Sequence, residues 1–236
     1  MVCTPSSSSG FLGDLENSYR RRLIHFDSGV KVPLLPDHIW IVVRGIVKLS
    51  CLNEQGDDVL VAIAGPNEPF GEPLTHLDLY EATTLDHCDL LGLSMQDVNT
   101  TPHLSISLMK AMMHRTRQSE ALIALLGLRG VENRVRSFLE LLAEDYGHPC
   151  DQGLKLDLRL THQEIASAVS TTRVTVTKIL GQLKENGWLQ HDNQQRIIVS
   201  HLPSRNPTEH KKNSCLSKTF FKVRAPDKRQ KNNQPS

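Results

Sequence analysis

Residues 160–190, "LTHQEIASAVSTTRVTVTKILGQLKENGWLQ", constrain the fold of this chain more than any other stretch. Thr161 is followed three residues later by Glu164, the spacing of a capping box, which marks the start of a helix. A second helix is predicted from about Thr172 to Glu185, where an Asn-Gly pair ends it. Two short helices joined by a tight turn form a helix-turn-helix pattern. The positions predicted to face inward are Ile165, Ala166, Val169, Val174 or Val176, Ile179, Leu180 and Leu183.

Strands are predicted on both sides of this helix pair. The run "LKLDLRL" at residues 154–160 alternates apolar and polar side chains, as a half-buried strand does. After the second helix, Trp188 and Leu189, the polar turn "HDNQQ" and the run "RIIV" predict a β-hairpin. Together these elements predict a winged helix-turn-helix.

The first turns of the second helix have an unusual composition. "TTRVTVTK" at residues 171–178 is rich in threonine and valine, whose branching at Cβ makes them mediocre helix formers. In a helix-turn-helix unit these turns enter the major groove of DNA, where arginine pairs with guanine and methyl groups pack on thymine. The sequence therefore predicts a helix that gives up helix propensity for contacts with base pairs. The residues predicted to contact DNA are Thr161, His162, Gln163, Thr171, Thr172, Arg173, Val174, Thr175, Thr177 and Lys178.

The N-terminal part, from residue 23 to about 100, has the texture of an all-β domain. Its apolar runs are short and are separated by turn residues: "HIWIVVRGIVKLSCL", "DDVLVAIAG" and "ATTLDHCDLLGLS". "NEQGDD" at residues 53–58 is a turn between two such runs and predicts a hairpin. Short strands at this spacing predict a barrel or a roll.

A long helix is predicted next. Pro102 suits the first turn of a helix, and the helical pattern continues to about Leu128. Its stripe at spacing 4-3-4-3-4 is typical of a coiled-coil seam, which predicts a partner helix; the alternative is a core helix of a monomer. Polar groups in the middle of the stripe need a ligand or a hydrogen bond across subunits. The stripe consists of Leu108, Met112, Arg115, Ser119, Leu122 and Leu126, with Glu120 adjacent.

The predicted fold class is α+β. We expect a loose segment at 1–22, a β-roll at 23–100, a dimerisation helix at 101–129 and a winged helix-turn-helix at 130–200, followed by a basic disordered tail at 201–236. Within the fourth region, "VENRVRSFLELLAEDY" at 131–146 predicts an amphipathic helix, and "GHPCDQG" at 147–153 ends it.

Charge is distributed unevenly along the chain. The whole chain has a net charge of +1, but the tail carries nine lysines and arginines against Glu209 and Asp227, so the remainder is acidic. A basic, polar tail is expected to be disordered and either to add non-specific affinity for phosphates or to have no role.

Cysteine spacing and hydropathy exclude several classes of protein. The five cysteines show no C-x-x-C spacing, which argues against a zinc ribbon, an iron–sulfur cluster or a disulfide framework. No apolar run is long enough to span a membrane, and the N-terminus lacks the features of a signal peptide. We therefore expect a cytoplasmic protein with reduced thiols.

The helix-turn-helix stretch, together with "VVRGIVKLS", "PFGE" and "RGVENRVRSFLELLAEDYG", resembles the Crp/Fnr superfamily of transcription regulators. Within it, the resemblance is greatest to the NtcA group of cyanobacterial nitrogen-control regulators and covers roughly residues 23–200. It implies a homodimer that binds a two-fold symmetric operator of the GTA…TAC kind, with RNA polymerase as a partner, in nitrogen or other nutrient-stress control. By position, Arg173, Val174 and Lys178 would contact bases and phosphates, and Ser170 stands where the family commonly has glycine.

The resemblance is weaker at the expected effector site. Arg115 and Glu120 match positions that hold 2-oxoglutarate in the nitrogen regulators, but Asp78 and Glu81 stand where a basic residue would be needed. The phosphate-binding cassette for cyclic AMP is not visible beyond a Gly-Glu pair. Neither 2-oxoglutarate nor cyclic AMP is therefore expected to be the effector. The candidate effector-binding residues are Gly71, Glu72, Arg115 and Glu120.

Two other hypotheses compete with a DNA-binding regulator. One is a ligand- or partner-binding module whose helix-turn-helix has lost contact with DNA; retention of Arg173 and Lys178 argues against it. The other is a cupin-like metal enzyme, with ligands among His38, His76, His87 and His103, but these lack the spacing of a metal motif. No catalytic residue and no metal ligand is predicted.

Overall fold

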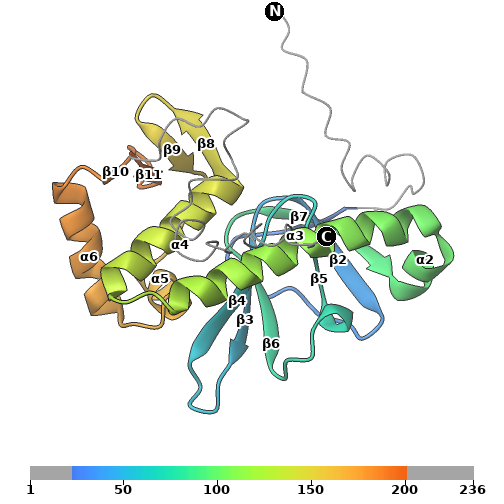
Figure 1. Cartoon of the computed structure of the whole chain (residues 1–236). Coiled ribbons are helices and arrows are strands. Elements are labelled where there is room, and N and C mark those ends of the chain that lie inside the picture. Colours follow the sequence, from blue (N-terminus) through green and yellow to red (C-terminus); the bar gives the residue numbers. More distant parts are fainter. Residues whose placement is uncertain (1–22, 201–236) are drawn as a thin grey trace, which may run out of the picture. The chain divides into compact units, whose positions relative to one another are not determined.

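The computed structural model describes residues 23–200 (Figure 1). The predicted loose segment 1–22 and basic tail 201–236 lie outside these residues. The elements in chain order are β1 (Ile24–Phe26), β2 (His38–Arg44), β3 (Val47–Leu52), β4 (Asp58–Ala64), β5 (Pro69–Phe70), η1 (Glu72–Leu74), β6 (Tyr80–Thr84), β7 (Cys88–Ser94), α2 (Met95–Thr100), α3 (Pro102–Leu126), α4 (Val131–Tyr146), β8 (Gly147–Cys150), β9 (Gly153–Leu156), α5 (His162–Ala168), α6 (Arg173–Glu185), β10 (Leu189–His191) and β11 (Ile197–Val199).

The N-terminal strands form two antiparallel sheets that share a core. One sheet has the order β1-β7-β2-β5 and the other β4-β3-β6. Strand β2 is buried on both faces, because Trp40 and Val42 belong to the core of the roll while Ile39 and Ile41 pack with residues of α2 and α3. The roll predicted from the sequence is confirmed, and so is the hairpin turn between β3 and β4. The short helix α2 was not predicted.

Helix α3 corrects the predicted coiled-coil seam. Leu108, Arg115 and Leu122, which belong to that seam, are buried within the chain itself. The helix therefore packs this stripe on its own β-roll and on the α4 region, and Figure 1 shows α3 running along the roll. A different stripe remains exposed, on which the apolar side chains Ile106, Met109, Met113 and Ile123 are 49%, 58%, 51% and 71% exposed.

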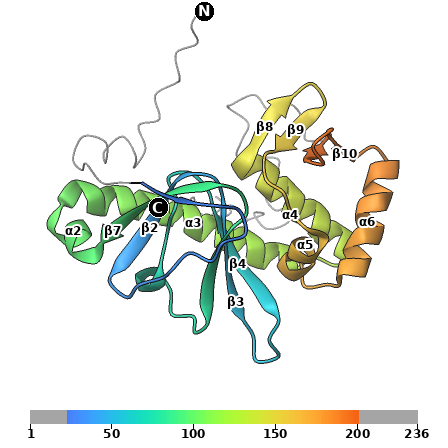
Figure 2. The same cartoon turned by 180° about the vertical axis from the view of Figure 1, so that it is seen from behind.

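The C-terminal elements form a second core around α4. The predicted helix at 131–146 is confirmed, and it buries Val135, Phe138, Leu139 and Leu142 against α5, α6 and the strands that follow. The helix ends at "GHPCDQG" as predicted, but no strand was predicted there, and Gly147–Cys150 forms β8 and pairs with β9. This strand lies at the edge of the sheet β10-β11-β9-β8 (Figure 2). Its polar residues and its proline are untypical of a strand, so the sequence pattern did not indicate it.

Within residues 23–200, no helix is long and apolar enough to cross a membrane. Cys51, Cys88 and Cys150, the cysteines in this range, are free thiols as predicted. Burial raises the pKa of the Cys88 thiol to about 11, which keeps it protonated.

Candidate nucleic-acid interface and effector region

The helix-turn-helix is formed by α5 and α6, and its local signals match the prediction. The Thr161 side chain accepts a hydrogen bond from the Glu164 amide, and the Glu164 carboxylate accepts one from the Thr161 amide at 2.6 Å, completing the capping box. Ala166 is fully buried where the helices meet, and the amide of Thr171 in the turn donates to its carbonyl. Ser170 has φ +51°, a left-handed conformation that usually favours glycine.

Helix α6 turns one face inward and leaves the other free. Val176 is fully buried, whereas Val174 is 79% exposed, which resolves the choice between these two valines as the inward position. Arg173 and Lys178 are exposed and have no ion-pair partner among residues 23–200. The first turns of α6 therefore present the cations Arg173 and Lys178 and the methyl groups of Val174 and Thr177 on the exposed face.

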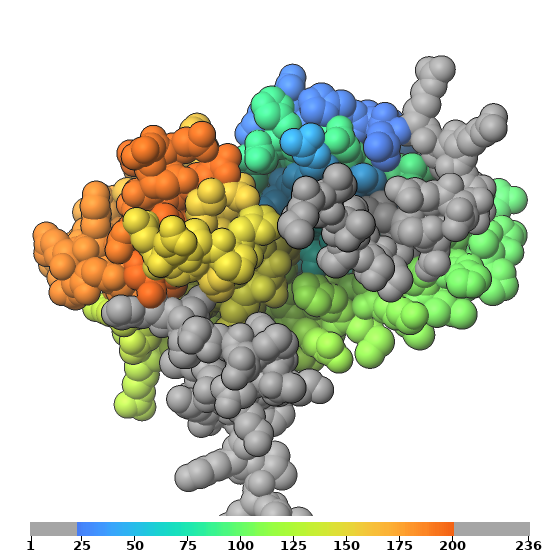
Figure 3. Space-filling view, turned by 90° about the horizontal axis from the view of Figure 1, so that it is seen from above, coloured from blue at the N-terminus to red at the C-terminus, as the bar shows by residue number. Residues whose placement is uncertain are grey.

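Hydrogen bonds give the threonines of this region distinct roles. Thr172 caps α6, since its Oγ1 accepts from the Thr175 amide at 3.2 Å and lies 2.9 Å from the Thr175 hydroxyl. Thr177 donates to the carbonyl of Arg173 at 2.9 Å and lies 2.8 Å from Nδ1 of His162. Of the α5 residues predicted for DNA contact, His162 is thereby linked to α6, and Gln163 is exposed. The orange atoms of α6 and the hairpin lie on the surface in Figure 3.

The predicted wing is present as β10 and β11. The Asp192 side chain accepts hydrogen bonds from the amides of Gln194 and Arg196, both at 2.9 Å, and these amides hold the pKa of Asp192 below its usual range. At the base of the wing, Arg196 bonds Asp157, and the guanidinium of Arg136 lies 5.2 Å from the centre of the Trp188 ring. The wing is thus anchored to both β9 and α4.

The four candidate effector residues lie on two elements: Arg115 and Glu120 on α3, and Gly71 and Glu72 at the start of η1. Arg115 is only 8% exposed, and its guanidinium donates to the Pro69 carbonyl at 3.2 Å and to the Tyr80 hydroxyl at 3.1 Å. Gly71 and Glu72 follow β5 beside this contact, with Glu72 exposed. Glu120 is exposed on α3. Two N–H groups of Arg115 are therefore used within its own chain, and the contact of its other N–H groups with a ligand or a second subunit stays a prediction.

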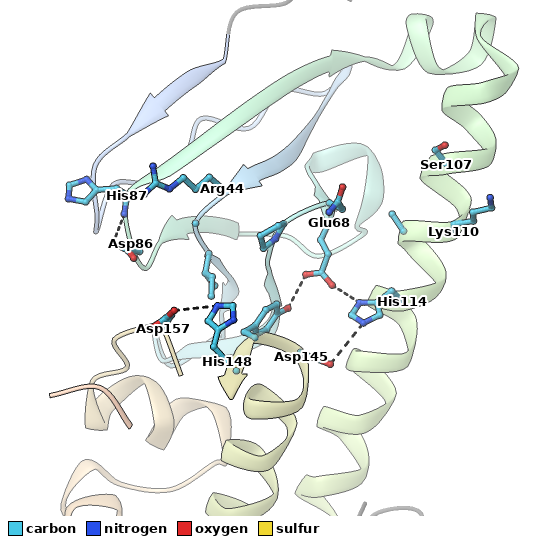
Figure 4. Close-up of a pocket in the computed structure, with 17 residues that line it drawn as sticks. Arg44, Glu68, Asp86, His87, Ser107, Lys110, His114, Asp145, His148 and Asp157 are labelled. Atoms are coloured by element: carbon cyan, nitrogen blue, oxygen red, sulfur yellow. Dashed lines mark hydrogen bonds and ion pairs between the residues drawn. The ribbon is translucent and has the colours of Figure 1, made fainter. Parts of the chain in front are cut away.

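A cleft of about 870 Å³ lies where the roll meets α3 and α4 (Figure 4). Turns of the roll contribute Arg44, Glu68 and His87, while α3 contributes Lys110 and His114. The acids Glu68, Asp145 and Asp157 in its wall have partners within the chain, whereas Arg44 and Lys110 have no ion-pair partner among residues 23–200. None of the four candidate effector residues lines it.

One wall of the cleft is a hydrogen-bond network centred on Glu68. Its carboxylate lies 2.6 Å from Nδ1 of His114 and 2.9 Å from the Tyr146 hydroxyl, and this contact with Glu68 raises the pKa of His114. Gln118 donates to Asp145 at 3.0 Å and to Tyr146 at 2.7 Å, and it accepts from the Ile63 amide at 3.1 Å. Burial raises the pKa of Asp145 and Tyr146.

This network links the roll, α3 and the end of α4. Sequence patterns did not predict it, because its members are separated by up to 83 residues and carry no local motif. A signal was available only in the polar side chains His114 and Gln118 on an otherwise apolar helix face.

Comparisons with known proteins agree with this geometry. A Crp-like helix-turn-helix domain matches residues 133–204, and a cyclic nucleotide-binding domain matches residues 34–101. A global nitrogen regulator from Nostoc sp. is 35% identical over 159 residues, covering 63% of this chain and 71% of the relative. This chain belongs to the Crp/Fnr family.

Other Crp/Fnr relatives extend the match. The regulatory protein CysR of Synechococcus elongatus is 33% identical over 171 residues, covering 71% of this chain and 79% of the relative. The crystal structure of TTHB099, a transcriptional regulator of the CRP family from Thermus thermophilus, superposes with a TM-score of 0.65 at 20% identity and covers 76% of this chain and 92% of that one. The α+β fold class is thereby confirmed.

Membership of the Crp/Fnr family establishes the general activity. The chain is a non-enzymatic, helix-turn-helix DNA-binding transcription regulator. Its β-roll matches a domain that holds small-molecule effectors in this family.

Proposed function

We propose that this regulator binds a two-fold symmetric operator of the GTA…TAC kind as a homodimer, with α6 of each copy in successive major grooves. The observation that carries the proposal is the exposed Arg173 at the first turn of a capped helix, beside Val174 and Lys178; residues 23–200 provide no ion-pair partner for it. An arginine there is suited to a bidentate contact with a guanine edge. Thr161, His162, Gln163, Thr171, Thr172, Thr175 and Thr177 complete the proposed contact surface.

The exposed stripe of α3 supports dimer formation. From Ile106, the positions 109, 113, 116, 120 and 123 follow at alternating spacings of three and four residues, the period of a coiled coil. Burying these side chains in a paired helix removes apolar surface from water, worth roughly 25 cal/mol per Å². Thr116 and Glu120 interrupt the apolar stripe and would set the register of the two helices.

We propose that the regulator controls transcription in response to nutrient stress, such as a change in nitrogen supply. The global nitrogen regulators and CysR among the relatives support this class of control, and RNA polymerase is the proposed protein partner in the cytoplasm. The effector itself is proposed to be neither 2-oxoglutarate nor cyclic AMP. Arg115 already donates to Pro69 and Tyr80. The exposed Asp78 would repel a dicarboxylate, whereas Glu81 is paired with Lys31 at 2.7 Å.

Gel-shift titration tests the DNA-binding part. Wild type, Arg173→Ala and Lys184→Ala are titrated against a GTA-N8-TAC duplex and a scrambled duplex; Lys184 is an exposed cation at the other end of α6 and serves as the matched control. Losing a contact worth about 1–3 kcal/mol in each of the two half-sites should weaken operator binding by Arg173→Ala at least about tenfold, and Lys184→Ala should bind like wild type. Equal operator binding by wild type and Arg173→Ala would instead favour a module that does not read DNA. Adding 2-oxoglutarate should not change any of the titrations.

A further inference from the structure

We propose that His25, Asp27 and His87 bind a divalent transition-metal ion of the Zn²⁺ class, at a site separate from the DNA-binding surface. His25 ends up beside the β6–β7 turn because β1 pairs with β7. One potential ligand atom from each of the three residues lies within 4.8 Å of the other two. It is the only group of three potential metal-ligating side chains found within residues 23–200.

The distances suit ligands of one metal ion. Asp27 Oδ1 lies 3.3 Å from Nδ1 of His87 and 3.8 Å from Nε2 of His25. Zinc bonds nitrogen and oxygen at about 2.0–2.2 Å, so two ligands of a tetrahedral ion lie roughly 3.3 Å apart. The first pair has this spacing already, and a small side-chain rotation brings the second to it.

A neighbouring carboxylate orients one of the histidines. Asp89 lies opposite His25 in the β1–β7 register, and its Oδ1 is 2.9 Å from Nδ1 of His25. When Nδ1 donates this bond, the lone pair of His25 is on Nε2, the atom that faces Asp27. Carboxylate–histidine pairs of this kind are the usual support of a metal-binding imidazole. The rings of His25 and His87 are stacked with centroids 5.9 Å apart, so a rotation of the rings is needed for their in-plane lone pairs to meet at one ion.

Local charge favours a cation. Asp27, Asp86 and Asp89 surround the two histidines, while Arg44, opposite Asp89 in the β2–β7 register, makes no ion pair with it in the described part of the chain. Cys88 is excluded as a ligand because it is fully buried and its Sγ bonds the carbonyls of Ile46 and Asp86.

The donor set indicates the class of metal. Two imidazoles and one carboxylate suit Zn²⁺, Ni²⁺ or Cu²⁺, whereas Mg²⁺ and Ca²⁺ prefer oxygen ligands. The side chains of His25, Asp27 and His87 are 61%, 76% and 66% exposed, which leaves room for water to complete the coordination. A bound ion would join β1 and the loop after it to the β6–β7 turn.

Isothermal titration calorimetry of the untagged full-length chain with ZnCl₂ tests the site. The chain has 11 histidines, so wild type is compared with His25→Ala/His87→Ala and with the control His76→Ala, an exposed histidine outside the cluster. We expect the double variant to lose the tightest Zn²⁺ site, His76→Ala to retain it, and MgCl₂ to give no specific binding. Asp89→Asn should lower the affinity about 10- to 100-fold, as loss of a supporting partner does.

Thermal unfolding gives a second readout. Zn²⁺ should raise the Tm of wild type and of His76→Ala but not that of the double variant, and all three proteins should have the same Tm in EDTA because the replaced side chains are exposed. Identical Zn²⁺ isotherms for wild type and the double variant would overturn the proposal, whatever their DNA binding.

Discussion

Ser170 is where the conformation of a single residue limits stability. It lies in the turn between α5 and α6 with φ +51°. This left-handed conformation is unfavourable for a residue that has a Cβ atom but not for glycine. Ser170→Gly should therefore raise the free energy of unfolding by about 1 kcal/mol. Urea denaturation measures the difference, and Ser170→Ala, which keeps the Cβ, should bring no gain. A glycine variant no more stable than the alanine variant would show that the turn carries no such strain.

His114 makes stability depend on pH. Its pKa is raised above the unfolded value of about 6.5 chiefly by its hydrogen bond to Glu68, with Asp145 adding attraction and Arg117 opposing it. Stability from this contact is fully present below the unfolded pKa and is lost as pH rises through the raised folded pKa. Because the imidazole side chain is 52% exposed, solvent screens part of the effect.

The His114→Gln variant isolates this contribution. Glutamine keeps a hydrogen-bond donor but cannot titrate in this range, so the stability advantage of wild type over the variant should shrink as pH rises from about 6 to about 9. Urea unfolding at several pH values measures it. A difference that stays constant with pH, or grows, would mean that the imidazole is neutral throughout.

At the scale of elements, α3 shows what sequence pattern can and cannot determine. The helical period of the apolar residues and the start of the helix at Pro102 could be predicted from the sequence. However, the helix has apolar residues on two faces. The pattern alone did not tell which face packs on the roll, so Leu108 and Leu122 were assigned to the seam although they are buried within the chain. The stripe that we propose to face a second copy could be located only from the packing of α3 on the roll.

The exposed stripe of α3 makes the dimer testable. The double variant Met113→Glu/Ile123→Glu introduces two carboxylates into the exposed stripe. If two α3 helices pair through this stripe, these carboxylates are buried without partners, which is strongly unfavourable. Sedimentation velocity should show a dimer for wild type and a monomer for the double variant, while Lys110→Gln, on the same helix outside the stripe, stays dimeric. A double variant that remains a dimer would place the interface elsewhere.

At the scale of the whole molecule, local and long-range features differed in how well they could be predicted. Caps, the α5–α6 turn and the wing hairpin depend on residues close in sequence, and these were predicted nearly residue by residue. The Glu68–His114–Tyr146 network and the His25–Asp27–His87 cluster assemble residues from distant elements. Only the pairing of strands and the packing of α3 bring these residues together, so no local sequence pattern could predict the network or the cluster.

The proposed recognition of the operator by the whole regulator depends on a contact between Arg173 and a base edge. Fluorescence anisotropy with the symmetric GTA…TAC duplex, and with a duplex in which the guanine of both half-sites is changed, measures discrimination by wild type and Arg173→Ala at one fixed salt concentration. We predict that wild type prefers the intact duplex by at least about tenfold, from about 1–3 kcal/mol per contact, and that Arg173→Ala binds both duplexes equally. If Arg173→Ala kept the preference of wild type, this arginine would not be the reader and the proposed recognition of the operator would be contradicted.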